Sequence, residues 1–372
     1  MPAGLYLHIP FCKSRCSYCD FATDIYRDSA GVERYVEALC RELTAVVTRD
    51  TVVDSIYFGG GTPSILSPVQ TGKILDVVNL THDITPSAEV TMEMNPATVT
   101  PESLRGYRSH GVNRASFGVQ TFNDQSLRLL ARGHDAKDAT VTFSMLRAEG
   151  FANVSFDLIA GLPSQTMDDW ESNLDEAISL SPEHISLYLL EIHSGTPLAA
   201  QVKSGRQPVP DDELAAEMYE VMLDRLAAAG YEQYEISNFC RPGYESRHNS
   251  KYWALDPVYG FGVSAHSFDG YQRYSNERDT AKYVERIEDG SGAEDWRERV
   301  NLASEFAFLG LRMEAGIDLD DYEKRYGLRL ETKFAQEFER LLSEGLIVLR
   351  DGRLQLSRRG KLFSNEVFSV FV

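Results

Sequence analysis

Three of the five cysteines lie within one short segment, Cys12-Lys-Ser-Arg-Cys16-Ser-Tyr-Cys19, with the spacing C-x3-C-x2-C. Thiolates are soft ligands that favour zinc and iron–sulfur clusters. A closed zinc site takes four ligands, and the nearest further candidate, His8, lies on an expected strand that points it away or into the core. A [4Fe–4S] cluster normally takes four thiolates as well, so three would leave one iron open.

An open iron could bind a bidentate amino-carboxylate, such as the methionine end of S-adenosylmethionine. Electron transfer from the cluster into the sulfonium would then break a C–S bond and yield a carbon radical. Three free or zinc-bound thiols are the alternative interpretation. The odd cysteine count argues against a secreted disulfide framework and favours a reducing compartment.

The elements that position this loop alternate between short β-branched runs and longer amphipathic segments. The expected strands are Leu5–Phe11, Ser55–Phe58, Glu89–Met94, Arg114–Val119, Asn153–Ile159 and His184–Leu190. Helices are expected between them, including Val32–Val47, Pro101–His110 and Thr166–Leu180. Repeated strand–helix units imply parallel strands with right-handed crossovers. The chain is therefore expected to be α/β, either a doubly wound sheet or a partial (β/α) barrel.

Polar residues recur at the carboxyl ends of these strands, where barrel enzymes build their reactive face. The glycine triplet of Phe58-Gly59-Gly60-Gly61-Thr62-Pro63 would let backbone groups approach a ligand closely. Taken singly, each polar residue could equally form a structural ion pair, for example Arg132 with Asp157. The candidate ligand contacts in this part of the chain are Gly60, Gly61, Thr62, Glu93, Gln120, Arg132 and Asp157.

The second half of the chain contains an aromatic-rich region, 240–289, that we expect to be irregular. It follows a linker at Pro208–Asp212 and a helix over Asp212–Ala229, and it contains Arg247-His248-Asn249-Ser250-Lys251-Tyr252-Trp253. A histidine beside two large aromatic rings suits a porphyrin, since imidazole ligates iron and the rings can wall the macrocycle. A buried core histidine is the alternative, and His266 and Cys240 are rival iron ligands.

From Trp296 onward the pattern changes to short helices and a hairpin that turns at Asp351-Gly352, which predicts a winged-helix-like α+β module. The net charge is −19, and this tail has as many basic as acidic residues, so residues 1–295 carry the whole excess. Such a balance argues against nucleic acid as a partner. No apolar run is long enough to span a bilayer and no secretory signal is visible, so we expect a cytoplasmic protein.

The segment Tyr6-x-His8-Ile9-Pro10-Phe11-Cys12, continued by Cys16-x-Tyr18-Cys19, resembles the radical S-adenosylmethionine superfamily. More narrowly, nearly the whole chain is similar to the oxygen-independent coproporphyrinogen III oxidases and to the HemW-type heme chaperones. The resemblance implies a partial (β/α)6 barrel and a [4Fe–4S] cluster on Cys12, Cys16 and Cys19. It also implies S-adenosylmethionine bound by the seven residues above together with Tyr6 of the first strand and Tyr18 of the cysteine loop, and heme at His248, Asn249, Tyr252 and Trp253.

Two features separate those families. The oxidases have a fourth cysteine two positions after the third, where this chain has Phe21, and only five residues precede Tyr6, which leaves no room for the oxidases' N-terminal extension. The H-N-x-x-Y-W element is typical of the chaperones. We therefore expect a heme chaperone that transfers heme to an acceptor protein. Oxidative decarboxylation of coproporphyrinogen III is the alternative, and another radical reaction is the third option.

The expected domains are the radical S-adenosylmethionine core at 1–210, a barrel extension with the aromatic-rich segment at 211–290, and the C-terminal module at 291–372. The expected partners are heme (or a porphyrinogen), an unidentified heme acceptor and an electron donor. A homodimer is a further option, and membrane contact is expected only through the acceptor.

Overall fold

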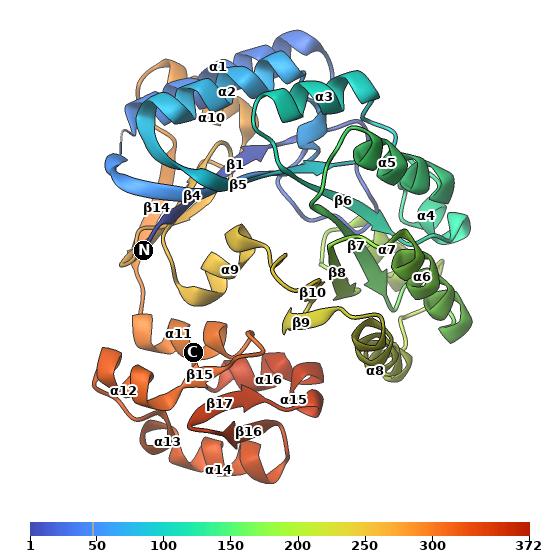
Figure 1. Cartoon of the computed structure of the whole chain (residues 1–372), viewed down its shortest axis with the longest axis vertical. Helices are drawn as coiled ribbons and strands as arrows, with labels where there is room; N and C mark the ends of the chain where they lie inside the picture. The colour runs from blue at the N-terminus through green and yellow to red at the C-terminus, as the bar shows by residue number, and fades with distance from the viewer. Residues whose placement is uncertain (47) are drawn as a thin grey trace.

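The computed structural model describes residues 1–46 and 48–372. Its core is one 12-stranded sheet in which the strands follow the order β14-β13-β12-β11-β1-β4-β5-β6-β7-β8-β10-β9. The strands from β11 to β8 in this order pair in parallel, whereas the strands flanking them on either side pair antiparallel. The sheet curls around an inner face and its helices lie outside, as Figure 1 shows. This arrangement is the predicted partial barrel.

Each of the six predicted parallel strands is present. They are β1 (Ala3–Ile9), β4 (Thr48–Gly60), β5 (His82–Met94), β6 (Arg114–Gln120), β7 (Val154–Ala160) and β8 (His184–Leu189). The helices that cover or flank them are α1 (Ser29–Ala45), α2 (Pro68–Thr81), α3 (Pro101–Ser109), α4 (Asp124–Leu129), α5 (Ala136–Ala148), α6 (Met167–Leu180), α7 (Pro197–Lys203) and α8 (Asp212–Ala228). The predicted end of the first helix, Val47, lies outside the described residues.

Local sequence signals set the boundaries of these helices. Thr100 caps α3 and Thr166 caps α6, and each threonine hydroxyl accepts a hydrogen bond from the backbone N–H of the third helical residue. In both cases the residue at that third position bonds back to the capping residue, which satisfies two backbone donors that would otherwise lack partners. These caps place α3 and α6 directly after the ligand-facing ends of β5 and β7.

The prediction that residues 240–289 are irregular is wrong. This region contains α9 (Arg247–Ala254), β11 (Val258–Phe261), β12 (His266–Phe268), β13 (Gln272–Asn276) and α10 (Thr280–Glu288). β11 extends the parallel sheet beside β1, and β12 and β13 continue it antiparallel toward β14 (Glu294–Arg299). These strands have only three to five residues, so an alternation of apolar and polar side chains cannot distinguish them from an aromatic-rich loop. At the opposite edge, β9 (Glu232–Glu235) and β10 (Asn238–Cys240) form a hairpin on β8.

The C-terminal part forms a separate apolar core and matches the predicted winged-helix-like module. Its elements are α11 (Leu302–Gly310), β15 (Ile317–Asp318), α12 (Leu319–Tyr326), α13 (Leu330–Lys333), α14 (Ala335–Ser343), β16 (Ile347–Arg350), β17 (Arg353–Leu356), α15 (Arg358–Leu362) and α16 (Ser364–Ser369). Asp351 and Gly352 both have positive φ, which makes the hairpin turn that the Asp-Gly pair predicts. In Figure 1 this module lies below the barrel, with α9 between the two.

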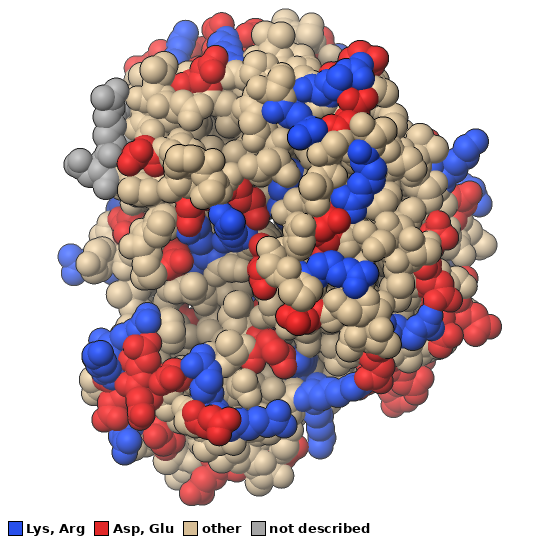
Figure 2. All heavy atoms as spheres, viewed as in Figure 1, with Lys and Arg blue, Asp and Glu red and all other residues tan. Residues whose placement is uncertain are grey.

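Acidic and basic side chains are interspersed over the face shown in Figure 2, with no single basic patch on that face. None of the helices in the described part of the chain is both long and apolar enough to cross a bilayer.

A buried carboxylate ties α1 to the β11 edge of the barrel. Glu42 accepts hydrogen bonds from the Gly262 backbone N–H at 2.8 Å, from Asn276 at 2.7 Å and from the Tyr283 hydroxyl at 2.6 Å.

Replacing Glu42 by leucine should lower the free energy of unfolding by about 3 kcal/mol or more, because three buried donors lose their acceptor. Urea unfolding followed by circular dichroism measures the change. Glu37→Leu, at an exposed position of the same helix, should change it by less than about 0.5 kcal/mol; equal effects of the two variants would contradict the role of Glu42.

Candidate functional site

The cysteine loop leaves β1 at the carboxyl end of the parallel strands. A small parallel pair, β2 (Phe11–Cys12) and β3 (Asp24–Ile25), closes the loop at its base. The backbone of the glycine triplet holds it, with Gly61 N–H donating to the Ile9 carbonyl and Thr62 N–H to the Phe11 carbonyl, both at 2.8 Å. The loop is therefore fixed to β1 and β4 at the edge where parallel-barrel proteins bind their ligands.

The three loop thiols are free and partly exposed. The Thr62 hydroxyl lies 3.6 Å from the sulfur of Cys12, and Arg132 Nη1 lies 3.4 Å from that of Cys16. Burial raises the pKa of Cys12 and, at the other end of the array, that of Cys19. Among the described residues no three ligating side chains converge closely enough to hold a single metal ion. The donor set nonetheless suits a cluster, since three soft ligands share one loop and two outside groups donate hydrogen bonds to the sulfurs.

The glycine triplet is required by close contacts as much as by a ligand. Gly60 has φ +111°, and a Cβ there would lie 2.6 Å from the His8 ring. A Cβ on Gly61 would lie 2.7 Å from the Pro10 backbone. His8 itself is committed, because its Nε2 bonds to the Ala22 carbonyl at 2.9 Å and its Nδ1 to the Tyr6 hydroxyl at 3.1 Å. His8 therefore has no free ring nitrogen for a fourth metal ligand.

Glu93 extends from β5 into the barrel interior. Its Oε1 accepts from the Tyr57 hydroxyl at 2.7 Å and its Oε2 from the Gly60 N–H at 3.2 Å. Burial raises the pKa of Glu93 to about 7, more than these two hydrogen bonds lower it. The carboxyl group can therefore change its charge near neutral pH, in direct contact with the glycine triplet.

Gln120, Arg132 and Asp157 gather at the ends of β6 and β7. A bulge between Gly118 and Gln120 re-aims the end of β6, and Gln120 has a positive φ of 68°. Strained backbone of this kind clusters at functional sites. The Arg132–Asp157 ion pair considered above is not the arrangement found: Arg132 Nη2 bonds to the Gly118 carbonyl at 2.6 Å, and Arg132 acts on Asp157 only through space. Burial raises the pKa of Asp157 to about 6.

Tyr18 joins this group from the cysteine loop, packed against the small apolar cluster of Leu130, Ile159 and Leu162. Burial raises its pKa, which Arg132 nearby partly opposes. The predicted S-adenosylmethionine contacts thus lie on the inner face of the barrel and at its carboxyl end.

The predicted heme residues lie toward the other end of the barrel. His248, on α9, is 1% exposed and packs against Ser55 and Tyr57 of β4. Its Nδ1 lies 3.2 Å from the Ser55 hydroxyl and its Nε2 3.2 Å from the Tyr252 hydroxyl. Burial lowers the pKa of His248 to about 3, so the ring is neutral. Both ring nitrogens are therefore already engaged in this structure.

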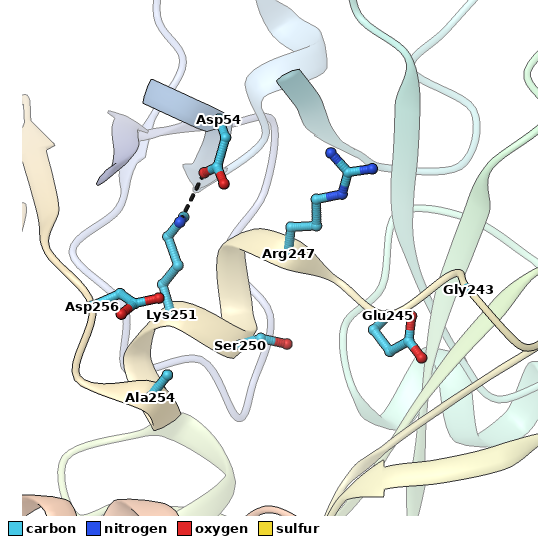
Figure 3. A pocket seen from close by; sticks show the side chains of 8 residues that line it. All are labelled: Asp54, Gly243, Glu245, Arg247, Ser250, Lys251, Ala254 and Asp256. Atoms are coloured by element: carbon cyan, nitrogen blue, oxygen red, sulfur yellow. Dashed lines mark ion pairs between the residues drawn. The ribbon is translucent and has the colours of Figure 1, made fainter. Parts of the chain in front are cut away.

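The outer side of α9 lines a polar pocket of about 270 Å³, drawn in Figure 3. Lys251 reaches across it to Asp54, at 2.8 Å, and also donates to the Pro2 carbonyl at 2.8 Å. The pocket is smaller than the usual range for drug-sized ligands. Its ion pair anchors α9 to the start of the barrel and leaves no room for a porphyrin.

Asn249 and Trp253 complete the predicted heme group. Both are partly exposed, and Asn249 takes part in the α9 cap through its backbone N–H, which donates to the Ser246 hydroxyl. The guanidinium of Arg312, from the C-terminal module, lies 4.3 Å from the Trp253 ring centroid. Arg312 also pairs with buried Glu235 of β9 at 3.2 Å. α9 thus contacts the barrel interior through His248 and the C-terminal module through Trp253.

The rival iron ligands fare differently. Cys240 is buried, and burial raises its pKa to about 12, so its thiol stays protonated. His266 is exposed, with Nδ1 3.0 Å from the Ser264 carbonyl and its ring against Trp296.

Two interior residues were missed from the sequence, Tyr57 and Arg114. On neighbouring strands, Tyr57 of β4 is in register with Tyr6 of β1 and with Thr91 of β5. Thr91 is in turn in register with Arg114 of β6. Alternation along β6 places Arg114, Ser116 and Gly118 on one face, which is the signal that could have identified the arginine.

Comparison with known proteins agrees with this geometry. The radical SAM superfamily model matches residues 6–177 and the HemN C-terminal domain model matches residues 299–363. Heme chaperone HemW of Bacillus subtilis is 38% identical, with 99% of this chain and 98% of that protein covered. Heme chaperone HemW of Mycobacterium tuberculosis is 35% identical over 98% and 94%. A mitochondrial radical S-adenosyl methionine domain-containing protein 1 of Bos taurus is 36% identical over 96% and 84%.

Among solved structures, coproporphyrinogen III oxidase (HemN) from Escherichia coli superposes with a TM-score of 0.87 at 25% identity, covering 100% of this chain and 90% of that one. The fold therefore agrees with relatives matched along nearly their full length, and the cysteine loop lies within the residues that the radical SAM model matches. The chain belongs to the HemW heme chaperone family within the radical SAM superfamily.

Proposed function

We propose that this protein binds heme together with a [4Fe–4S] cluster and S-adenosylmethionine, and delivers the heme to an acceptor protein. The nearly full-length match to relatives named heme chaperones carries the proposal. Phe21 supports it, because this ring stands where the oxidases have a fourth cysteine, and it is 64% exposed. We place the protein in the cytoplasm, with an electron donor as a further partner.

In this proposal Cys12, Cys16 and Cys19 hold the cluster, which supplies an electron to the sulfonium of S-adenosylmethionine when both are bound. The protein's own groups set the surroundings. Thr62 and Arg132 donate hydrogen bonds toward the sulfurs, which stabilises the thiolate form. Glu93 and Asp157 accept from the amino and hydroxyl groups of the ligand, with Gln120, Tyr6 and Tyr18 completing its contacts.

We place the heme at α9, with His248 as the iron ligand, Tyr252 beside it on the inner side and Asn249 and Trp253 as the further contacts. Because Nε2 of His248 is hydrogen-bonded to Tyr252, iron must displace that hydroxyl on binding. A second location is a cavity of about 800 Å³ beside the cysteine loop, lined by Phe21, Arg15 and Arg27 among others. It offers an exposed ring, but its four arginines stand among five carboxylates and its lining contains no histidine, so it suits heme propionates less well.

Coproporphyrinogen III oxidation is the second candidate, favoured by the structural likeness to HemN from Escherichia coli. An anaerobic assay with coproporphyrinogen III, a reductant and S-adenosylmethionine separates the two. We expect saturable hemin binding and hemin transfer to an apo-hemoprotein, with no carbon dioxide release. Decarboxylation at a steady rate would overturn the chaperone assignment.

The binding of S-adenosylmethionine should depend on pH through Glu93. The ligand is cationic at its sulfonium and its amine and hydroxyl groups donate hydrogen bonds, so it favours the ionised carboxylate of Glu93, and protonation of Glu93 must weaken binding. With a pKa of about 7, about nine-tenths of Glu93 is protonated at pH 6, so the dissociation constant should rise about tenfold between pH 8 and pH 6. Equilibrium dialysis with the reconstituted protein measures it.

Glu93→Gln should bind more weakly at pH 8 and lose this pH dependence. The pKa of Asp157 is raised to about 6, so this residue affects the dissociation constant only near the lower, pH 6 end of the range. An unchanged pH profile in Glu93→Gln would show that other groups govern binding.

A further inference from the structure

The interior of the barrel contains a buried arginine that the proposed function has not used. Arg114, the first residue of β6, is 1% exposed and ranks among the largest fully buried side chains. Its Nε has no hydrogen-bond partner among the described residues. A buried cation is costly unless it is paired, so such a group indicates a missing anionic partner.

The carboxylates around Arg114 do not supply that partner. Glu93 and Asp157 feel its charge through space, which lowers the pKa of each, but their hydrogen bonds go elsewhere. Glu93 is bonded to Tyr57 and Gly60, and Asp157 to Ser186. Glu93, with a pKa of about 7, is in addition about half protonated at neutral pH.

The remaining polar groups around the arginine are neutral. His184 bonds to the hydroxyls of Ser155 and Tyr234, each at 2.8 Å, and burial keeps its pKa well below its usual value. His248 is likewise neutral. Tyr57 and Tyr234 are uncharged, since burial raises the pKa of both hydroxyls well above their usual range. Arg114 therefore carries a fixed positive charge in the inner layer that these side chains form with β4, β6, β8 and α9, and its Nε is bonded to no described group there.

We propose that Arg114 is a carboxylate-binding site inside the barrel and takes a propionate of the bound tetrapyrrole. This inference rests on the proposed function and adds the group that would orient the bound tetrapyrrole. Guanidinium groups bind carboxylates through two parallel hydrogen bonds, which fixes orientation as well as adding affinity. His248 stacks on Tyr57, and Tyr57 and Arg114 are both in register with Thr91 on the strand between them, so one macrocycle could contact both His248 and Arg114.

The carboxylate of S-adenosylmethionine is the competing partner. The predicted contacts of that ligand include Gly60, Gly61 and Arg132 at the carboxyl end of the strands, next to the cysteine loop. Arg114 lies at the beginning of β6, toward the opposite end. A tetrapyrrole propionate that reaches inward from the open end, or from the α9 side, fits this position better.

The test compares hemin with hemin dimethyl ester, whose propionates carry no charge, on the cluster-reconstituted full chain. We expect the wild type to bind hemin about ten- to a hundredfold more tightly than the ester, the usual weight of a hydrogen-bonded charge pair. Arg114→Gln should bind hemin as weakly as the ester and the ester as the wild type does. Arg114→Lys should keep part of the preference, and the surface variant Arg105→Gln all of it. At pH 9, where Glu93 and Asp157 stay ionised without the charge of Arg114, the affinity for S-adenosylmethionine should be unchanged in all of them.

Each other outcome overturns the inference in a distinguishable way. Equal affinity of the wild type for hemin and ester would leave heme binding intact and remove the propionate contact. A loss of affinity in Arg114→Gln that is equal for both ligands would make the arginine structural. Weakened S-adenosylmethionine binding would assign it to that ligand. No saturable binding of either porphyrin by the wild type would remove the proposed function together with the inference.

Discussion

Cys16→Ser should reduce the iron and sulfide content of anaerobically reconstituted protein to near background. Cys16 is the central thiol of the array, and Arg132 donates to its sulfur at 3.4 Å. With three protein thiolates, the cluster has no spare ligand in the loop, because Phe21 occupies the fourth position and His8 is committed to Tyr6 and Ala22. Removal of one thiolate leaves two ligands for a cluster that needs at least three. Iron and acid-labile sulfide per chain, together with the electron paramagnetic resonance signal after reduction, measure the outcome.

Cys40→Ser is the matched control for this prediction. Cys40 is a buried free cysteine on α1, outside the loop. Its replacement should leave the iron content unchanged, although stability can fall because a hydroxyl replaces a packed thiol. Full cluster occupancy in Cys16→Ser would mean that another side chain completes the site, whereas iron loss in both variants would indicate a general folding defect.

The parallel core could be predicted from the sequence because each of its strands is a distinct apolar run and its helices carry strong caps. Thr100 with Ser103, and Thr166 with Asp169, have the three-residue spacing of a helix cap, which can be recognised in the sequence without knowledge of the fold. The cysteine loop was equally visible, since its chemistry depends on neighbours in sequence.

The roles of the inward-facing residues were harder to predict, because each role depends on contacts with residues far away along the chain. Glu42 appears as an acid on an amphipathic helix, although it follows Leu39 by three residues and so shares the buried face. The residues that donate hydrogen bonds to it, Gly262, Asn276 and Tyr283, lie more than 200 residues away along the chain. The position of α9 against Ser55 and Tyr57 could not be predicted either, since no local pattern couples a short helix to a strand so distant in sequence.

Hemin titration of the reconstituted protein should show a saturable Soret band that is lost in His248→Ala and strengthened in Tyr252→Phe. The opposite signs follow from the geometry of α9. Nε2 of His248 is the nitrogen that faces the Tyr252 hydroxyl, at 3.2 Å, and Nδ1 is held by Ser55. If His248 ligates the iron, removing the hydroxyl frees Nε2, and the hydrogen bond no longer has to be broken on binding. A hydrogen bond of about 1 kcal/mol corresponds to about fivefold tighter binding in Tyr252→Phe.

The pair of variants separates a ligand from a packing residue. If His248 were only a core side chain, His248→Ala would destabilise the fold. Tyr252→Phe would then weaken hemin binding or leave it unchanged, because loss of the hydroxyl would not free an iron ligand. Circular dichroism of both variants identifies the first case. Saturable binding that ignores both substitutions would move the heme to the cavity beside Phe21, where Phe21→Ala should then reduce affinity, or to exposed His266. Cys240 is the least suited alternative, since its pKa of about 12 keeps the sulfur protonated and iron binds the thiolate.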